Sequence, residues 1–340
     1  MDENIQNCDL SKSYYIKEIE DETHVKHNVF YVNKNIPLDE EIIKEMEKYD
    51  FVEFGNKFNH SVDNLPSRIK SIIFGNNFNK SVDNLPLGLE NLTLGIGFDS
   101  LVDNLPSTLQ SLTFDMWFNQ PVDNLPNFNP EKGIKGLQSL KFGCNFNKSV
   151  DNLPSGLKNL TFGSEFNQSI NNLPSGLQSI TFGYKFNQSV DNLPSGLKSL
   201  TFGDYFNQSV DNLPAGLKSL TFCDYFNQPI DHLPAGLQNL TFGSKFNQPV
   251  NNLPLGLQSI TFGREFNQPV NNLPSGLENL EFGCKFNQPL DNLPVLHPKK
   301  GIKGLQNLTI YSFYDFPLNN IPESVKITTK LFYNIFNTNN

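Results

Sequence analysis

The stretch TFGDYFNQSVDNLPAGLKSL, from Thr201 to Leu220, decides the fold because the chain repeats it. It returns at Thr221 as TFCDYFNQPIDHLPAGLQNL and at Thr241 as TFGSKFNQPVNNLPLGLQSI. Thirteen such repeats, of 20 or 28 residues, follow one another over residues 53–328. Self-similarity at a fixed short period is typical of stacked-repeat proteins, in which each repeat packs on its neighbours.

Each repeat contains one short strand followed by bends. From Leu197 to Gly203, apolar residues fall at every second or third position, which favours a strand with one buried face over a helix. Asn, Asp, Pro and Gly at fixed offsets mark bends and leave no room for a helix of ordinary length. The sequence therefore predicts a mainly β solenoid of about 13 stacked 20-residue coils.

Stacking of near-identical coils aligns equivalent side chains. Two Phe per repeat, such as Phe202 and Phe206, would form two buried columns at the strand spacing of about 4.8 Å, which accounts for the 30 Phe of the chain. The Asn after the second Phe, such as Asn207, is expected to serve backbone groups of a neighbouring coil. Contact of this Asn column with a ligand is the alternative.

The phrase LxxLTFGxxFNQxVxxLPxxL resembles the FNIP repeat, a relative of the leucine-rich repeat found in proteins of amoebae and giant viruses. FNQP occurs verbatim at Phe226, Phe246, Phe266 and Phe286. The resemblance implies a non-catalytic protein–protein interaction scaffold. Because many family members carry an N-terminal F-box, it also implies a substrate-recruiting adaptor of the host cytoplasm, bound to a ubiquitin-ligase subunit or its substrate. The first fifty residues hold one short predicted helix rather than three apolar helices.

The residues outside the repeats divide into three segments. Residues 1–27 are polar and charged, which predicts a tail, and they lack the basic start and apolar run of a secretory signal. Residues 28–52 are predicted to form an N-terminal cap with a short helix over Leu38–Tyr49. Residues 53–328 form the solenoid. Residues 329–340 are a predicted C-terminal cap and tail, in which apolar residues would cover the last coil.

Two repeats are 28 residues long, with eight extra residues in the same place. Duplication of a block of the chain that already contained the eight extra residues explains why both repeats are extended at the same place. The alternative is that the basic residues of the insertions form two protrusions that grip an acidic partner. These residues are Lys132, Lys135, Lys299, Lys300 and Lys303.

Composition excludes several classes of protein. A net charge of −9 argues against a nucleic-acid partner, and no stretch approaches the roughly 20 apolar residues of a membrane span. Cys144, Cys223 and Cys284 lie three or more coils apart, about 14 Å or more at the strand spacing, whereas a disulfide needs Cα atoms within about 7 Å. We therefore expect an intracellular, reducing compartment.

No residues point to catalysis. The sequence has no Gly-rich phosphate loop, nucleophile elbow or HExxH, so it predicts neither an enzyme nor a cofactor. His24 and His27 could supply half of a metal site, but no further His or Cys cluster joins them, and no metal is predicted. An Asp recurs in the bend, as at Asp191 and Asp211, and Asn replaces it at Asn171, which favours a turn hydrogen bond over a cation site.

The two positions after Phe-Gly vary between repeats while their surroundings are nearly constant. They follow the strand and carry the only Trp and three of the ten Tyr, which are residue types that dominate interfaces. We predict a partner surface here. Drift on a solvated edge is one alternative, and binding of a glycan or small ligand by rows of Tyr and Asn or Asp is another. The predicted surface consists of Met116, Trp117, Glu165, Tyr184, Lys185, Asp204, Tyr205, Asp224, Tyr225, Lys245, Arg264 and Glu265.

Overall fold

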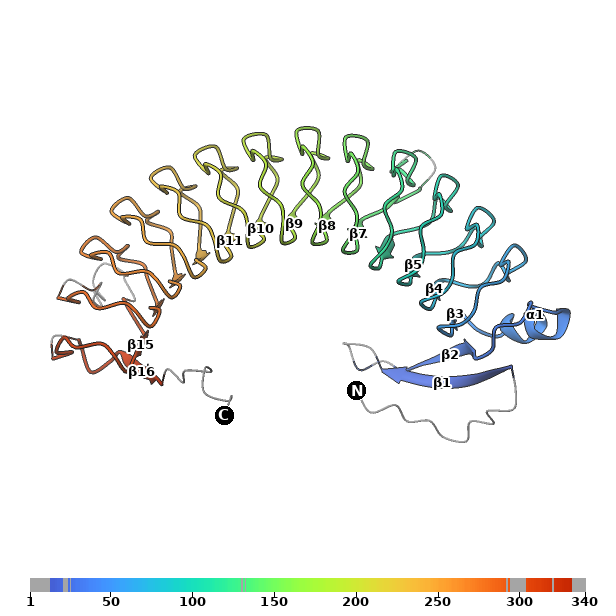
Figure 1. The fold of residues 1–340 in the computed structure, drawn as a ribbon, viewed down its shortest axis with the longest axis horizontal. Coiled ribbons are helices and arrows are strands. Elements are labelled where there is room, and N and C mark those ends of the chain that lie inside the picture. Colours follow the sequence, from blue (N-terminus) through green and yellow to red (C-terminus); the bar gives the residue numbers. More distant parts are fainter. Residues whose placement is uncertain are drawn as a thin grey trace, which may run out of the picture. The chain divides into compact units, whose positions relative to one another are not determined.

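The computed structural model describes residues 13–20, 24, 26–129, 131, 133–291, 293, 304–319 and 321–331. The chain divides into two compact units. Unit 1 comprises residues 1–168 and 172–177, and unit 2 comprises residues 169–171 and 178–340. Each unit is a solenoid in which one short strand per coil pairs with the strand of the next coil (Figure 1).

In unit 1, the strands follow chain order, and all neighbouring pairs from β2 onward are parallel. A single described helix, α1 (Glu40–Met46), lies between β2 and β3 (Figure 1). The strands are β1 (Tyr14–Glu20), β2 (Lys26–Val32), β3 (Phe51–Phe54), β4 (Ser71–Ile73), β5 (Asn91–Leu94), β6 (Ser111–Phe114), β7 (Ser139–Lys141) and β8 (Asn159–Thr161).

In unit 2, the described strands are all parallel, and equivalent residues of the repeat face each other, as Leu200 faces Leu220. The strands are β9 (Ser179–Thr181), β10 (Ser199–Thr201), β11 (Ser219–Thr221), β12 (Asn239–Thr241), β13 (Ser259–Thr261), β14 (Asn279–Glu281), β15 (Asn307–Tyr311) and β16 (Lys326–Lys330). The predicted stacking of one repeat per coil is therefore confirmed.

The strands are shorter than the sequence suggested, because both ends of the predicted segment take part in turns. Leu197 donates its N–H to the carbonyl of Pro194 at 3.1 Å, and Phe206 donates to the carbonyl of Gly203 at 3.2 Å. The strand β10 itself comprises residues 199–201. The strands of the repeats are thus short, with three to five residues each.

The two predicted Phe columns form the core of both units. In unit 2, Phe202 and Phe206 are fully buried, and their rings stack within one coil at 3.7 Å between centroids. From coil to coil, Phe202 lies 5.5 Å from Phe222, and Phe206 lies 6.1 Å from Phe226. Most coils add two rings to the same stack, and a coil buries its apolar face only when its neighbours are present.

The Asn column has the structural role predicted from the sequence. The side-chain oxygen of Asn207 accepts a hydrogen bond from the backbone N–H of Asn227 at 2.9 Å, and Asn227 accepts from Asn247 at the same distance. The same ladder runs through unit 1, where Asn147 accepts from the N–H of Asn167 at 2.9 Å. Each Asn satisfies one backbone group in the following coil, where no strand pairing can do so.

The N-terminal part differs from the sequence prediction. Residues 14–20, which were expected to belong to a polar tail, form β1 and pair antiparallel with β2. Tyr14 stacks on Phe30 with 4.7 Å between ring centroids, and Lys17 pairs with Glu53 at 2.7 Å, so β1 covers the edge of β2. The expected boundary at residue 27 lies inside β2. Residues 1–12 lie outside the described residues.

The helix of the N-terminal cap, α1, lies within the predicted range Leu38–Tyr49 but is shorter than predicted. The side chain of Asp39 accepts a hydrogen bond from the N–H of Ile42 at 2.9 Å and caps α1, and Glu40 and Glu41 occupy the first turn. Acidic residues there suit the positive end of the helix dipole. Ile42 and Met46 are buried, so one face of the helix packs on the solenoid.

Asn129 and Ile134 of the first insertion form an antiparallel bridge. Asn129 and Ile134 exchange two backbone hydrogen bonds of 3.0 and 2.9 Å, and Gly133 has a φ of 66°, which favours glycine. Lys135 is exposed. The other four basic residues of the insertions lie outside the described residues, so the two basic protrusions stay a prediction. These are Lys132, Lys299, Lys300 and Lys303.

Candidate interaction surface

The variable residue pairs lie on the turn that follows each strand, and the backbone of this turn is fixed by the neighbouring coil. The N–H of Tyr205 donates to the carbonyl of Tyr184 at 3.0 Å, and that of Tyr225 donates to the carbonyl of Asp204 at 2.9 Å. These bonds use only the backbone. The side chains are therefore free to vary from coil to coil while the turn keeps its position.

Five large side chains on these turns are exposed. In unit 1, Met116 and Trp117 share one turn and expose 40% and 56% of their surface. In unit 2, Tyr184, Tyr205 and Tyr225 expose 42%, 43% and 48%. Such partial exposure leaves a ring face or edge available to a partner while the rest of the ring is held.

The three tyrosines of unit 2 form one continuous cluster. The rings of Tyr184 and Tyr205 lie 4.5 Å apart, and the Tyr184 hydroxyl donates to the Tyr205 hydroxyl at 3.2 Å. Tyr225 meets Tyr205 edge-on, at 5.2 Å between centroids and 68° between ring planes. The hydrogen bond to Tyr205 raises the pKa of Tyr184 to about 12, with smaller contributions from burial and from neighbouring charges. The ring contacts hold the three side chains as one surface.

Two carboxylates and a thiol accompany this cluster. Cys223 stands where most other coils have Gly, and its pKa is raised by burial first and then by the negative charges of Asp204 and Asp224. Both carboxylates therefore lie close to the thiol. Asp224 also accepts a hydrogen bond from the Ser244 hydroxyl at 2.7 Å. Cys223 was not among the residues predicted for this surface, although the change from TFG to TFC marks it.

The remaining predicted residues do not join the tyrosine cluster. Glu265 pairs with Lys285 of the next coil at 2.6 Å and approaches Arg264 at 3.8 Å. Lys285, which was not predicted, thus belongs to the same charged group. Lys185 and Lys245 are exposed on the turns on either side of Tyr205 and Tyr225, and Glu165 lies half-buried in unit 1.

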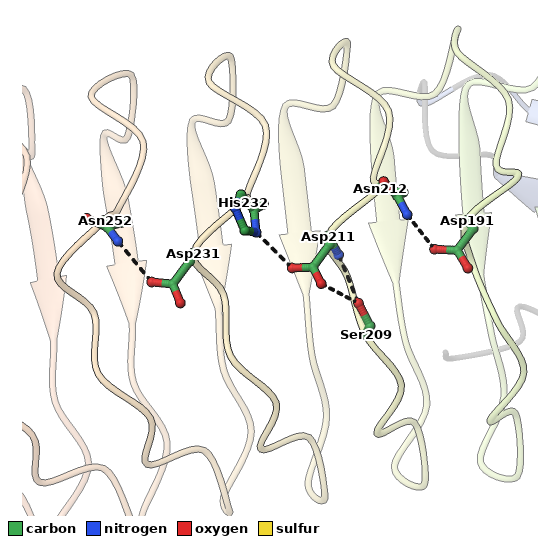
Figure 2. A network of polar contacts seen from close by, with 7 residues as sticks. All are labelled: Asp191, Ser209, Asp211, Asn212, Asp231, His232 and Asn252. Atoms are coloured by element: carbon green, nitrogen blue, oxygen red, sulfur yellow. Dashed lines mark hydrogen bonds and ion pairs between the residues drawn. The ribbon is translucent and has the colours of Figure 1, made fainter.

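The recurrent Asp residues in the bends form a second ladder of hydrogen bonds (Figure 2). Asn212 donates to Asp191 at 3.0 Å, and Asn252 donates to Asp231 at 3.0 Å. The hydroxyl of Ser209 donates to Asp211 within one turn at 2.9 Å, which confirms the predicted turn role.

One coil of this ladder has a His in place of Asn. The ring Nδ1 of His232 lies 3.1 Å from the carboxylate of Asp211 (Figure 2). Hydrogen bonds from Ser209 and then from His232 lower the pKa of Asp211. No group of three or more His, Cys, Asp or Glu that could hold a metal occurs in the described part of the chain.

A polar hollow of about 390 Å³ lies elsewhere, in unit 1. Tyr15, Tyr31, Asn56, Asn76 and Asp115 are among the residues that line it, next to the ion pair between Lys17 and Glu53. Rings and amide groups around a polar hollow are the kind of groups expected for a glycan site. Asn56 and Asn76 stand at variable positions directly after Phe-Gly, so the hollow includes part of the variable turns of unit 1.

Comparison with known proteins places the chain in a family. The FNIP Repeat family matches residues 58–97, 146–185, 186–225, 209–245, 226–252 and 246–285, which together make up more than half of the chain. The chain belongs to the FNIP-repeat family. The resemblance seen in the repeated phrase is thereby confirmed. No curated protein is similar to this FNIP-repeat chain.

A solved structure supports the same assignment for the fold. It is described as the crystal structure of CroV588, a novel circular LRR protein, from the giant virus CroV. It shares 37% sequence identity with the FNIP-repeat chain at a TM-score of 0.75, over 94% of this chain and 51% of CroV588. The FNIP-repeat chain thus spans about half the length of CroV588. The leucine-rich-repeat-like solenoid predicted from the sequence is confirmed.

Two further predictions concern membrane-spanning segments and the cysteines of the FNIP-repeat chain. In the described residues, no helix is long and apolar enough to cross a membrane. Cys144, Cys223 and Cys284 are free thiols, as their separation along the solenoid predicted. The thiol of Cys223 is half-buried beside the tyrosine cluster, so its state of modification would affect that surface.

Proposed function

We propose that this FNIP-repeat chain is a non-catalytic scaffold that binds a protein partner through the variable turns after its strands. The observation that carries this proposal is the exposed cluster of Tyr184, Tyr205 and Tyr225. Tyrosine is enriched among the residues that contribute most to protein interfaces. The three rings are already held by mutual contacts, so binding would cost little side-chain entropy.

The surrounding frame supports a recognition role for these turns. Stacked Phe rings and the Asn ladder fix every coil, whereas the turn positions differ in charge and size from coil to coil. Such a frame presents different side chains at constant spacing. Met116 and Trp117 supply a second apolar contact in unit 1.

A quantitative pull-down tests the proposal. The full chain is tagged in its native host cell, and partners are compared with those of a Trp117→Ala, Tyr184→Ala, Tyr205→Ala, Tyr225→Ala variant. A Leu255→Ser variant is the control, because Leu255 is 81% exposed and other coils, such as that of Ser275, have Ser at this position. We expect the fourfold variant alone to lose its specific partners. Unchanged recovery would contradict the proposal.

A narrower role as a substrate-recruiting adaptor linked to ubiquitination, in the cytoplasm of the host, is supported by the family resemblance. The partner would then be a ubiquitin-ligase subunit or a substrate of the ligase. We expect a ligase subunit to co-purify in the same experiment. Its consistent absence from the wild-type sample would remove this role and leave the scaffold proposal in place.

The polar hollow of unit 1 favours glycan or small-ligand binding as the second candidate function. Two tyrosines, two asparagines and Asp115 meet there, which are groups that stack on sugar rings and bind hydroxyls. A glycan array probed with the wild-type chain and with Asp115→Ala tests this candidate. Binding that the substitution removes would support it, and silence of the array at high protein concentration would dispose of it.

A further inference from the structure

The tyrosine cluster and its two carboxylates have a definite chemical character. Here the tyrosine–aspartate patch means Tyr184, Asp204, Tyr205, Asp224 and Tyr225, all in unit 2. The patch combines exposed aromatic rings with two negative charges on adjacent coils. Aromatic faces attract cations through their quadrupole, and carboxylates attract them by charge, so both parts of the patch favour the same kind of ligand.

Asp204 and Asp224 differ from other acidic residues of the solenoid in their contacts. Glu53 pairs with Lys17, Glu265 with Lys285 and Glu281 with Lys330. By contrast, Asp204 lies against the Cys223 thiol, and Asp224 accepts hydrogen bonds from the hydroxyl of Ser244 at 2.7 Å and from its N–H at 3.4 Å. Those groups donate hydrogen bonds but bring no positive charge of their own.

The rim of the patch limits the length of a cationic ligand. Lys185 and Lys245 are exposed on the coils that flank Tyr205 and Tyr225, at the same position of the repeat. A run of basic residues along the turns would meet these two lysines and be repelled. One cation placed between them would not. The patch therefore fits a single cationic side chain.

Of the two cationic side chains, arginine fits better. Its guanidinium is planar, stacks on aromatic rings, and presents several N–H groups that can reach two carboxylates at once. Lysine carries a compact, strongly hydrated charge, which has no planar face to stack on a ring and no fixed fork of donors. Asp204 and Asp224 stand on neighbouring coils, about 4.8 Å apart at the strand spacing, which is within the span of a guanidinium.

We propose that the tyrosine–aspartate patch binds one arginine side chain presented by an extended segment of a protein partner. The guanidinium stacks on one exposed ring of the patch, that of Tyr205 or Tyr225, and donates hydrogen bonds to Asp204 and Asp224. This inference rests on the proposed function, because it names the chemistry of a partner for part of the same surface.

Peptide binding tests the inference directly. The probes are fluorescein-labelled heptapeptides of Gly and Ser with one central residue, which is arginine, citrulline or lysine. Citrulline keeps the shape of arginine and removes its charge. Fluorescence anisotropy with the full chain at low salt is expected to give an affinity at least about tenfold higher for the arginine peptide than for the other two, because each lacks the charge or the planar fork.

Charge-matched variants locate the site. Asp204→Asn combined with Asp224→Asn is expected to lower the affinity for the arginine peptide about tenfold. Asp191→Asn combined with Asp231→Asn removes the same charge outside the patch, and other repeats already have Asn there, so this variant is expected to bind like wild type. Circular dichroism of both variants checks that they fold equally.

The possible results distinguish the arginine site from the broader proposal that the chain is a protein-binding scaffold. Equal affinity for the arginine and citrulline peptides, equal affinity for arginine and lysine, no measurable binding, or wild-type binding by the Asp204→Asn, Asp224→Asn variant would each overturn the arginine site. The scaffold proposal would survive all four results, provided that the tyrosine and tryptophan substitutions still abolish partner recovery in the pull-down.

Discussion

At the scale of single residues, each position of the repeat has one clear physical task. Asn207 accepts a hydrogen bond from the next coil, Phe206 fills the core, and Tyr205 meets solvent and its neighbouring rings. Of these three successive residues, one therefore links coils, one packs in the core and one is exposed. This division explains why some positions recur in every repeat and others differ.

The Asn ladder predicts a specific loss of stability. Asn207→Ala leaves the backbone N–H of Asn227 without its acceptor, and an unsatisfied, partly buried group costs about 1–2 kcal/mol. Urea unfolding measures this difference. Asp231→Asn is the control and is expected to change stability by less than about 0.5 kcal/mol, because its site is exposed and other repeats have Asn there. Equal effects of the two substitutions would refute the role of the ladder.

The tyrosine pair predicts a change in titration. Tyr205→Phe removes the oxygen that accepts the Tyr184 hydrogen bond, so the pKa of Tyr184 is expected to fall from about 12 towards its ordinary value of about 10. NMR titration of ring-labelled tyrosine measures it. Tyr225→Phe is the control, since Tyr225 contacts Tyr205 only edge-on, and it should shift Tyr184 less.

The same pair has a consequence for stability at high pH. The pKa of Tyr184 is higher in the folded chain than in the unfolded chain, so its contribution is fully present below about pH 10 and is lost as the pH rises towards about 12. Wild type should therefore lose more stability than Tyr205→Phe across this interval. Identical pH dependence of the two proteins would contradict the assignment.

At the scale of elements, short strands succeed because the Phe columns and turns hold them in place. Three-residue strands would be unstable alone. Here many strands lie between turns closed by Pro and Gly carbonyls, as at Pro194 and Gly203, and next to stacked Phe rings. The position of a strand is therefore set by packing and by turns more than by strand propensity.

The two Phe columns are expected to differ in how much stability the fold loses when a Phe is substituted. Phe206→Ala opens a cavity in a fully buried stack and should destabilise the fold by about 3–5 kcal/mol. Phe202→Leu should cost less than about 1.5 kcal/mol, because Leu94 already occupies the equivalent place in another coil. Urea unfolding of both variants measures the difference. Similar losses would mean that the columns are equivalent.

At the scale of the whole molecule, the repeat made most of the fold predictable. Coil number, the Phe columns, the Asn ladder and the turn positions all follow from a period of 20 residues. The strand β1 could not be predicted from the repeat. Its polar sequence pairs with β2 through its backbone and is held by contacts of Tyr14 and Lys17, and the repeat pattern does not indicate these contacts. At the candidate surface, the sequence indicated which turns carry the variable residues. It could not show that Tyr184 joins Tyr205 and Tyr225, since side-chain contacts depend on rotamers.

The repeat also predicts how the chain responds to deletions. Removing residues 221–240 joins Leu220 to Thr241, restores the phrase SLTF and brings Phe202 next to Phe242 in the same column. Because each coil contacts only its neighbours, this deletion is expected to keep a cooperative fold and to lower the unfolding free energy by the contribution of one coil. Removing residues 221–230 shifts the phrase by half a coil, misaligns the rings and should abolish cooperative unfolding. Circular dichroism and urea titration distinguish the two. The first deletion also removes Asp224 and Tyr225, so it should fold and yet bind the arginine peptide more weakly than the full chain, a combination that a merely unfolded variant cannot produce.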